Sequence, residues 1–123
     1  MSTINRLILS GRLVRDPEVR EIRDGLTVAK ITIVVSTMIR QKDGEEREEA
    51  CFIDCSLWNQ EARDAQRYLT KGKAITIEGR LKLEKWTDKN SGMERSKHVL
   101  VAENVTYLEK VVQLPDEVSQ TTL

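Results

Sequence analysis

The side chains that usually carry catalysis or hold a metal are scarce in this chain. His98 is the single histidine, and it stands beside Val99 in an alternating pattern typical of a β-strand. Cys51 and Cys55 are the two cysteines, and with one distant histidine they fall short of the four ligands of a structural zinc site. No set of acid, base and nucleophile accompanies His98. We therefore expect a protein that is not an enzyme and holds no metal.

The spacing of the cysteines argues against a disulfide within the chain. In a strand the backbone rises about 3.3 Å per residue, so the two Cα atoms would lie about 13 Å apart. A disulfide requires a Cα separation below about 7 Å. We expect two free thiols and a cytoplasmic protein, since disulfides are rare in that compartment. The N-terminus shows no secretory cleavage site, and no apolar run reaches the roughly 18–20 residues of a membrane span.

The aromatic side chains point instead to binding. Over residues 50–58, alternation places Phe52 and Trp58 on the polar face of a strand, opposite its apolar residues. Over residues 73–86, the same alternation places Trp86 on the polar face. Burying one such ring would stabilise the fold by about 2–3 kcal/mol, so an outward position needs a reason.

One reason is stacking on unpaired bases. Every base has a π-face, so a ring gains about 1–3 kcal/mol per base whatever the sequence. Lys82 and Lys85 flank Trp86 and could hold the phosphates of the same strand. A subunit interface, or an aromatic cluster between strands, is the alternative interpretation. Tyr68 and Tyr107 lie where ordinary packing explains them, and we assign them no binding role.

The net charge of zero hides an uneven distribution. The chain has 20 basic and 20 acidic residues. Residues 1–42 hold 8 basic and 4 acidic side chains, and residues 71–97 hold the same numbers, whereas residues 43–70 hold 3 and 8. The two basic blocks could form a groove that follows a nucleic-acid backbone, or they could be solvated strand faces.

The periodicity predicts a fold that is mostly β. Strands are expected at residues 4–14, 27–38, 50–58, 73–86 and 96–108, with a helix at 60–70. Asn59 is the expected N-cap of this helix, and Gly72 is its expected stop. In the fourth strand we expect Ile75, Ile77, Leu81 and Leu83 to face the core.

This order of elements matches a five-stranded OB-fold barrel, whose helix lies between strands 3 and 4. Glycines inside the long strands, Gly11 and Gly79, suit the bends of a small barrel. A β-sandwich of this length would usually have more strands. We expect one OB domain over residues 1–110 and a short flexible tail over residues 111–123.

Five segments resemble bacterial single-stranded DNA-binding proteins in order along the chain. They are residues 5–13 (NRLILSGRL), 16–20 (DPEVR), 68–73 (YLTKGK), 77–81 (IEGRL) and 85–88 (KWTD). The resemblance implies a nucleoid-associated homotetramer that binds single-stranded DNA in replication, recombination and repair, and that needs no cofactor. It also implies recruitment of partner enzymes through an acidic C-terminal tip. The chain as given lacks such a tip, so either the protein lacks this recruiting function or it is a paralogue or a truncated product.

The resemblance also assigns site residues. Trp86, Trp58 and Phe52 would stack on bases, while the family's remaining aromatic position falls near Ile39, which is not aromatic. Candidates for phosphate binding are Arg20, Lys71, Lys82 and Lys85, with Arg12 and Arg40 as weaker additions. Asp54 and Glu84 lie next to these aromatic positions and would repel phosphate unless a cation pairs with them.

Two other functions remain open at this stage. A primosomal accessory protein would use the same barrel as a dimer and would depend more on cations than on aromatics. An OB module that binds another protein would place the outward aromatics in its interface. Salt-sensitive binding of DNA and the mass in solution distinguish the three.

Overall fold

The computed structural model describes residues 2–108 of the chain. Within this range the strands are Leu7–Leu13 (β1), Glu18–Arg23 (β2), Leu26–Arg40 (β3), Glu46–Trp58 (β4), Ala74–Thr87 (β5) and Glu94–Tyr107 (β6), and the helix α1 is Gln60–Tyr68. The tail predicted over residues 111–123 lies outside the described residues, and the domain boundary at residue 110 stays a prediction.

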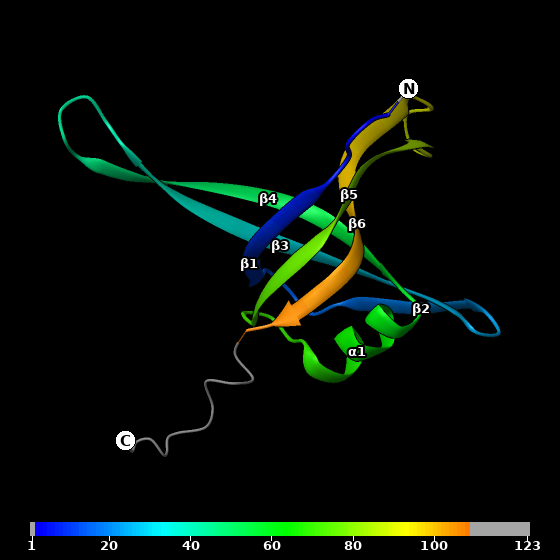
Figure 1. The fold of residues 1–123 in the computed structure, drawn as a ribbon. Coiled ribbons are helices and arrows are strands. Elements are labelled where there is room, and N and C mark those ends of the chain that lie inside the picture. The colour runs from blue at the N-terminus through cyan, green and yellow to red at the C-terminus, as the bar shows by residue number, and fades with distance from the viewer. Residues whose placement is uncertain (1, 109–123) are drawn as a thin grey trace, which may run out of the picture.

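Five of the strands form a closed barrel (Figure 1). The strand order is β1-β5-β6-β4-β3, and β1 closes the ring by pairing with β3 through Arg12 and Leu13. All of these pairings are antiparallel except that of β4 with β6. The helix follows β4 and precedes β5. The five-stranded OB barrel, with its helix between the third and fourth barrel strands, is therefore confirmed.

The sequence analysis missed one strand. β2 lies outside the ring and pairs only with β3, in the register Val19 with Ala29 and Arg20 with Val28. A hairpin turn at Gly25, whose φ is 76°, joins the two strands. The segment is mostly charged, and Val19 is its only residue that packs against the core. It therefore lacks the apolar alternation by which a strand is predicted.

The helix covers one end of the barrel with its apolar face (Figure 1). Ala62 and Ala65 of the helix, and Leu69 directly after it, are buried in the core. Of the two expected end signals, Asn59 at the N-cap position is confirmed, whereas Gly72 as the stop was wrong. Asn59 precedes the helix, but its side chain accepts a hydrogen bond from the Thr27 amide (3.2 Å) and caps no helical amide. The helix ends at Tyr68, before Gly72, because the chain becomes extended at Leu69, which turns into the core.

The core alternation of β5 holds only for its first half. Ile75 and Ile77 are fully buried, whereas Leu81 is 40% and Leu83 is 45% exposed, so the prediction that these two leucines face the core was wrong. The register between β5 and β6 shifts at Gly79. Outward from the pair Leu83 and His98, where β6 no longer pairs with β4, the two strands extend from the barrel as a two-stranded ribbon (Figure 1).

A second ribbon extends from the opposite side of the barrel. It is formed by β3 and β4, which stay paired as far as Arg40 and Glu46 (Figure 1). The predicted strands did not include this ribbon: the first ended at residue 38 and the next began at residue 50. Charged residues fill the end of this hairpin, so the apolar alternation is lost there. The two cysteines lie on β4 and are both free, with Cys51 exposed and Cys55 buried. Among the described residues, no helix is long and apolar enough to cross a membrane.

Candidate nucleic-acid interface

Three adjoining cavities share one lysine, Lys30 on β3, and we call them together the Lys30 groove. Their volumes are about 510, 180 and 510 Å³. The outer cavity on the β5–β6 side is lined by Lys82, Leu83, Glu84, Lys85, Trp86 and Lys97 besides Lys30. The small central cavity includes Arg15, Glu18, Thr32, Asp54, Ser56, Glu84 and Lys97. The cavity on the β2 side is lined by Glu18, Val19, Arg20 and Val28 besides Lys30.

The predicted aromatic residues lie outside the core, and two of them lie at this groove. Trp86 is 44% exposed and lines the outer cavity. Trp58 is 37% exposed and pairs across strands with Val28, which lines the β2-side cavity. Phe52 is 64% exposed and lies farther along β4, opposite Val34. The pleat of β4 places Phe52, Asp54 and Trp58 on the face opposite the buried Cys55 and Leu57, which is why alternation in the sequence predicted the outward position of the two rings.

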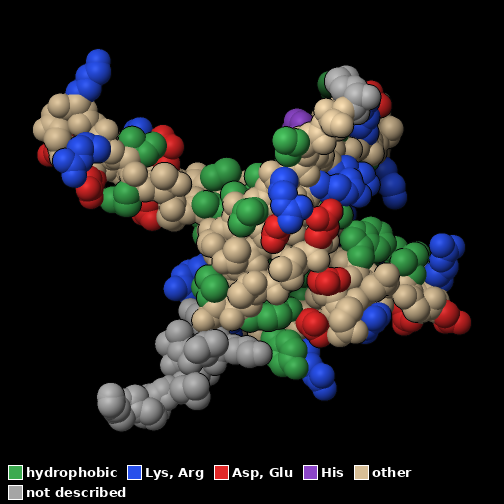
Figure 2. All heavy atoms as spheres, viewed as in Figure 1, with side chains coloured by type: hydrophobic (Ala, Val, Ile, Leu, Met, Phe, Trp, Pro, Cys, Tyr) green, Lys and Arg blue, Asp and Glu red, His purple; other side chains and the backbone are tan. Residues whose placement is uncertain are grey.

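The structure brings together three of the six basic residues that the sequence analysis named. Lys82 and Lys85 line the outer cavity beside Trp86, and Arg20 lines the β2-side cavity. In Figure 2, Lys and Arg side chains gather along the β5–β6 ribbon. One strand of nucleic acid could therefore meet exposed rings and cations along the same groove.

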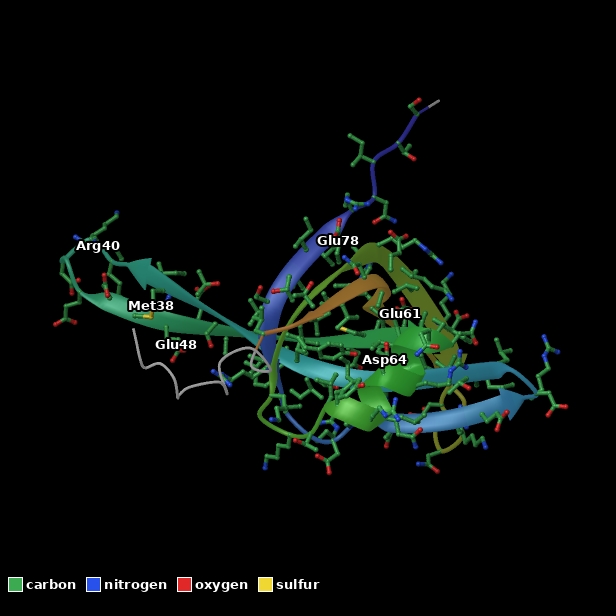
Figure 3. The ribbon with its side chains drawn as sticks, turned by 60° about the horizontal axis from the view of Figure 1, so that its bottom comes forward. Met38, Arg40, Glu48, Glu61, Asp64 and Glu78 are labelled. Carbon is green, nitrogen blue, oxygen red and sulfur yellow. The ribbon has the colours of Figure 1, made fainter. Side chains whose placement is uncertain are left out.

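The other three basic residues lie away from the Lys30 groove. Arg12 donates a hydrogen bond to the Gly72 carbonyl (2.9 Å) and lines a separate cavity of about 270 Å³, together with Val34. Lys71 lies in the turn after the helix, where its backbone amide donates to Asp16. Arg40 is near the end of the β3–β4 ribbon, 3.4 Å from Glu46 (Figure 3).

Sequence reasoning missed the two lysines at the middle of the groove. Lys30 is exposed between the buried residues Ala29 and Ile31, so the alternation of β3 would have found it. Lys97 gave no such signal, because its position depends on the pairing of β6 with β5. Its ammonium nitrogen lies 5.7 Å from the centre of the Trp86 ring, within the range of a cation–π contact.

Lys97 is also the cation that pairs with Asp54, which would otherwise repel phosphate. Its ammonium lies 2.6 Å from the Asp54 carboxylate, which also accepts a hydrogen bond from the Thr32 hydroxyl (2.6 Å). Burial by itself would raise the pKa of Asp54, but the hydrogen bonds from Lys97 and Thr32 and the charges of Lys97 and Arg15 outweigh it. The pKa therefore lies below its usual value of 3.8. Glu84 is opposite Lys97 in the strand register and lines the same two cavities.

The two tyrosines form a separate contact at the helix. Their rings meet edge to face at 5.9 Å, and Tyr107 packs against the core. Burial, followed by the nearby charges of Asp64 and Glu61, raises the pKa of Tyr107 to about 12. Figure 3 shows both acidic residues on α1. These features fit the packing role expected for the tyrosines, and Tyr68 lines none of the three groove cavities.

Comparison with known proteins gives one consistent result. Residues 4–108 match the family described as "Single-strand binding protein family". The chain is 45% identical over 105 residues to a single-stranded DNA-binding protein of Wolinella succinogenes, covering 85% of this chain and 64% of that protein. It is 37% identical over 106 residues to single-stranded DNA-binding protein 1 of Synechocystis, covering 86% of this chain and 84% of that protein.

The extent of these matches differs among the relatives. The chain spans 64% of the Wolinella protein and 61% and 59% of relatives from Helicobacter hepaticus and Helicobacter pylori.

Among solved structures, the chain is similar to a Plasmodium falciparum SSB in complex with ssDNA, with a TM-score of 0.78 and 20% identity. That likeness covers 88% of this chain and 97% of the other, and it supports the assignment of the fold.

The contacts of Asp54 predict how its pKa responds to Lys97. In a Lys97→Met variant the pKa of Asp54 should rise, because burial remains while the strongest hydrogen bond and the nearest positive charge are lost. Carboxyl-detected NMR titration measures this shift. Lys82→Met, which removes a lysine of the same groove that does not contact Asp54, is the matched control and should leave the Asp54 titration in place.

The same shift has a consequence for stability. A carboxyl whose pKa is depressed by folding stabilises the folded state above its unfolded pKa, and this contribution is lost as the pH falls through the folded pKa. The wild type should therefore lose more stability than Lys97→Met between neutral pH and pH values below the pKa of Asp54. An Asp54 pKa that does not change in Lys97→Met would contradict the ion pair.

Proposed function

The chain belongs to the single-strand binding protein family, and we propose that it binds single-stranded DNA with little sequence preference and catalyses no reaction. The observation that carries this proposal is one groove that contains Trp86 with Lys30, Lys82, Lys85 and Arg20, and beside which Trp58 pairs with the lining residue Val28. Exposed rings beside cations are what an unpaired, charged strand of bases requires.

In the proposed mechanism the rings bind the bases and the cations bind the backbone. Trp86 and Trp58 stack on bases at the two ends of the Lys30 groove, while Lys30, Lys82, Lys85 and Arg20 contact phosphates. Each phosphate contact releases counterions, so the affinity falls as salt rises, with a slope of about −0.7 per contact for single strands. Because no base edge is read, the affinity should depend only weakly on sequence.

We extend the path of the DNA along β4 to Phe52. Arg12, Val34 and Phe52 are directly paired across β1, β3 and β4, so their side chains share the outer face of the sheet. Phe52 would stack on a further base, with Arg12 near its phosphate. Lys71 and Arg40 are weaker candidates, since both lie outside this line and Arg40 is paired with Glu46.

A protein with these properties would protect transient single strands. We therefore propose roles in DNA replication, recombination and repair in the bacterial cytoplasm, at the nucleoid. The support for these roles is membership in the family and the sequence-tolerant chemistry of stacking. An OB module that binds only protein is the competing function, and it would show no salt-sensitive affinity for DNA.

Removing the indole of Trp86 tests the stacking role. Trp86→Ala should weaken the binding of an oligo(dT) strand by about 1–3 kcal/mol, and that of a mixed-sequence strand equally, because a stacked ring is lost in both cases. Fluorescence anisotropy of a labelled strand measures the affinity. Tyr68→Ala is the control, since it removes an exposed ring outside the groove and should leave the affinity unchanged. Equal affinities for Trp86→Ala and the wild type would rule out this stacking role.

The family resemblance implies a homotetramer, and we further propose that the chain forms a homo-oligomer. The support is an open strand edge, because Leu7–Gly11 of β1 pairs with β5 on one side and, among the described residues, with no strand on the other. Ile8, in the middle of this edge, is 60% exposed. A second copy that pairs along β1 would bury both features.

The mass in solution, measured by light scattering coupled to size exclusion, should be that of four chains. A dimer would favour the primosomal accessory protein over a tetrameric single-strand binder. A monomer at all concentrations would contradict the proposed oligomer. Ile8→Glu should reduce the mass by placing charge at the open edge, whereas Ile22→Glu, an exposed isoleucine on β2, should not.

A further inference from the structure

An acidic side chain occupies the middle of the groove that we propose to bind a polyanion. Asp54 lies on the outer face of β4 between Phe52 and Trp58, and it lines the central cavity of about 180 Å³. A carboxylate at this position should weaken the binding of DNA. Its contacts indicate what it does there.

Both carboxylate oxygens of Asp54 are engaged by donors that could equally bind a phosphate. Oδ2 lies 2.6 Å from the Lys97 ammonium, and Oδ1 accepts a hydrogen bond of 2.6 Å from the Thr32 hydroxyl. The Thr32 hydroxyl in turn accepts a hydrogen bond from the Arg15 guanidinium at 3.2 Å. An ammonium, a hydroxyl and a nearby guanidinium form a typical setting for a phosphate oxygen. In the free protein, the carboxylate of Asp54 takes the place that a phosphate group could occupy among these donors.

The same contact fixes Lys97 against the stacking surface. The Lys97 ammonium lies 5.7 Å from the centre of the Trp86 ring. A base that stacks on this side of the ring must displace the ammonium, which then becomes available to a phosphate of the same strand. The ion pair and the cation–π contact would therefore break together when DNA binds.

We propose that Asp54 is an internal competitor for DNA, a positioning residue that holds Lys97 over Trp86 until a phosphate of single-stranded DNA replaces the carboxylate. This inference rests on the proposed function and concerns the same groove. It explains how the chain can keep an acidic residue between two stacking rings. Asp54 lowers the affinity for DNA and neutralises Lys97 in the free protein.

The substitution Asp54→Asn tests this role. Asparagine has nearly the same shape and can still accept the Thr32 hydrogen bond, but it no longer holds the Lys97 charge. The affinity for oligo(dT) at low salt should rise about threefold to tenfold, and the salt slope should become steeper by up to about 0.7, the value of one phosphate contact. Asp64→Asn changes the net charge equally on α1, outside the groove, and should leave both quantities at their wild-type values.

A second readout follows Lys97 without any DNA. If Asp54 holds the ammonium over the ring, the indole N–H resonance of Trp86 in the free protein should shift in Asp54→Asn and in Lys97→Met, but not in Asp64→Asn. A general effect of net charge on the affinity would not move this resonance. Asp54→Ser, which is also uncharged, gives the same test if the asparagine variant does not fold.

The outcomes separate this inference from the proposed function. If the wild type shows no salt-sensitive binding of oligo(dT), the proposed function fails. If the wild type binds, but Asp54→Asn binds no more tightly than the wild type or than Asp64→Asn, the competitor role is overturned. A Trp86 resonance that is unchanged in Asp54→Asn would also overturn it, since Lys97 would then stay at the ring without Asp54.

Discussion

Two residue pairs, Arg12 with Val34 and Leu13 with Ile33, close the barrel by joining β1 to β3. A barrel of five strands has room inside only for side chains, so closure turns one face of each strand into the core and leaves the other outside. Glycine permits the close approach of strands that closure requires. A Cβ atom at Gly11 would overlap the Val34 carbonyl, and one at Gly79 would overlap the Val101 carbonyl. The outward positions of Lys30 on β3 and of Phe52 and Trp58 on β4 follow from this constraint.

The role of the charged residues can be understood only from their positions on the folded barrel. A net charge of zero appears unfavourable for a protein that binds a polyanion. The groove nevertheless gathers Lys30, Lys82, Lys85 and Lys97 beside Trp86. Acidic residues also enter the groove, and Asp54 is compensated there by Lys97. The affinity should then depend on stacking as much as on charge, with a moderate dependence on salt.

Sequence reasoning succeeded where a pattern is local. Alternation within single strands identified the barrel strands, the helix face and the outward positions of Phe52, Trp58 and Trp86. It failed where the outcome depends on partners far along the chain. Leu83 continues the alternation of β5, yet it is exposed, because its partner His98 lies where β6 no longer pairs with β4. The short strand β2 exists because β3 offers it an edge, and its own residues are mostly charged.

The same limit applies to the binding site. Arg20, Lys82 and Lys85 lie at the groove, as the sequence interpretation required. The position of Lys97 in the groove can be predicted only when the pairing of β5 with β6 is known. Arg40 resembles a groove cation in the sequence, but the length of the β3–β4 ribbon carries it away from the groove.

Photocrosslinking tests the central claim, that single-stranded DNA lies across the Lys30 groove, most directly. A strand with 5-iodouracil in place of thymine forms crosslinks to aromatic side chains that stack on it, and mass spectrometry of the digested complex locates them. The account predicts crosslinks at Trp86 and Trp58 and none at Tyr68, whose exposed ring lies outside the groove. Crosslinks at Tyr68 with none at either tryptophan would contradict it.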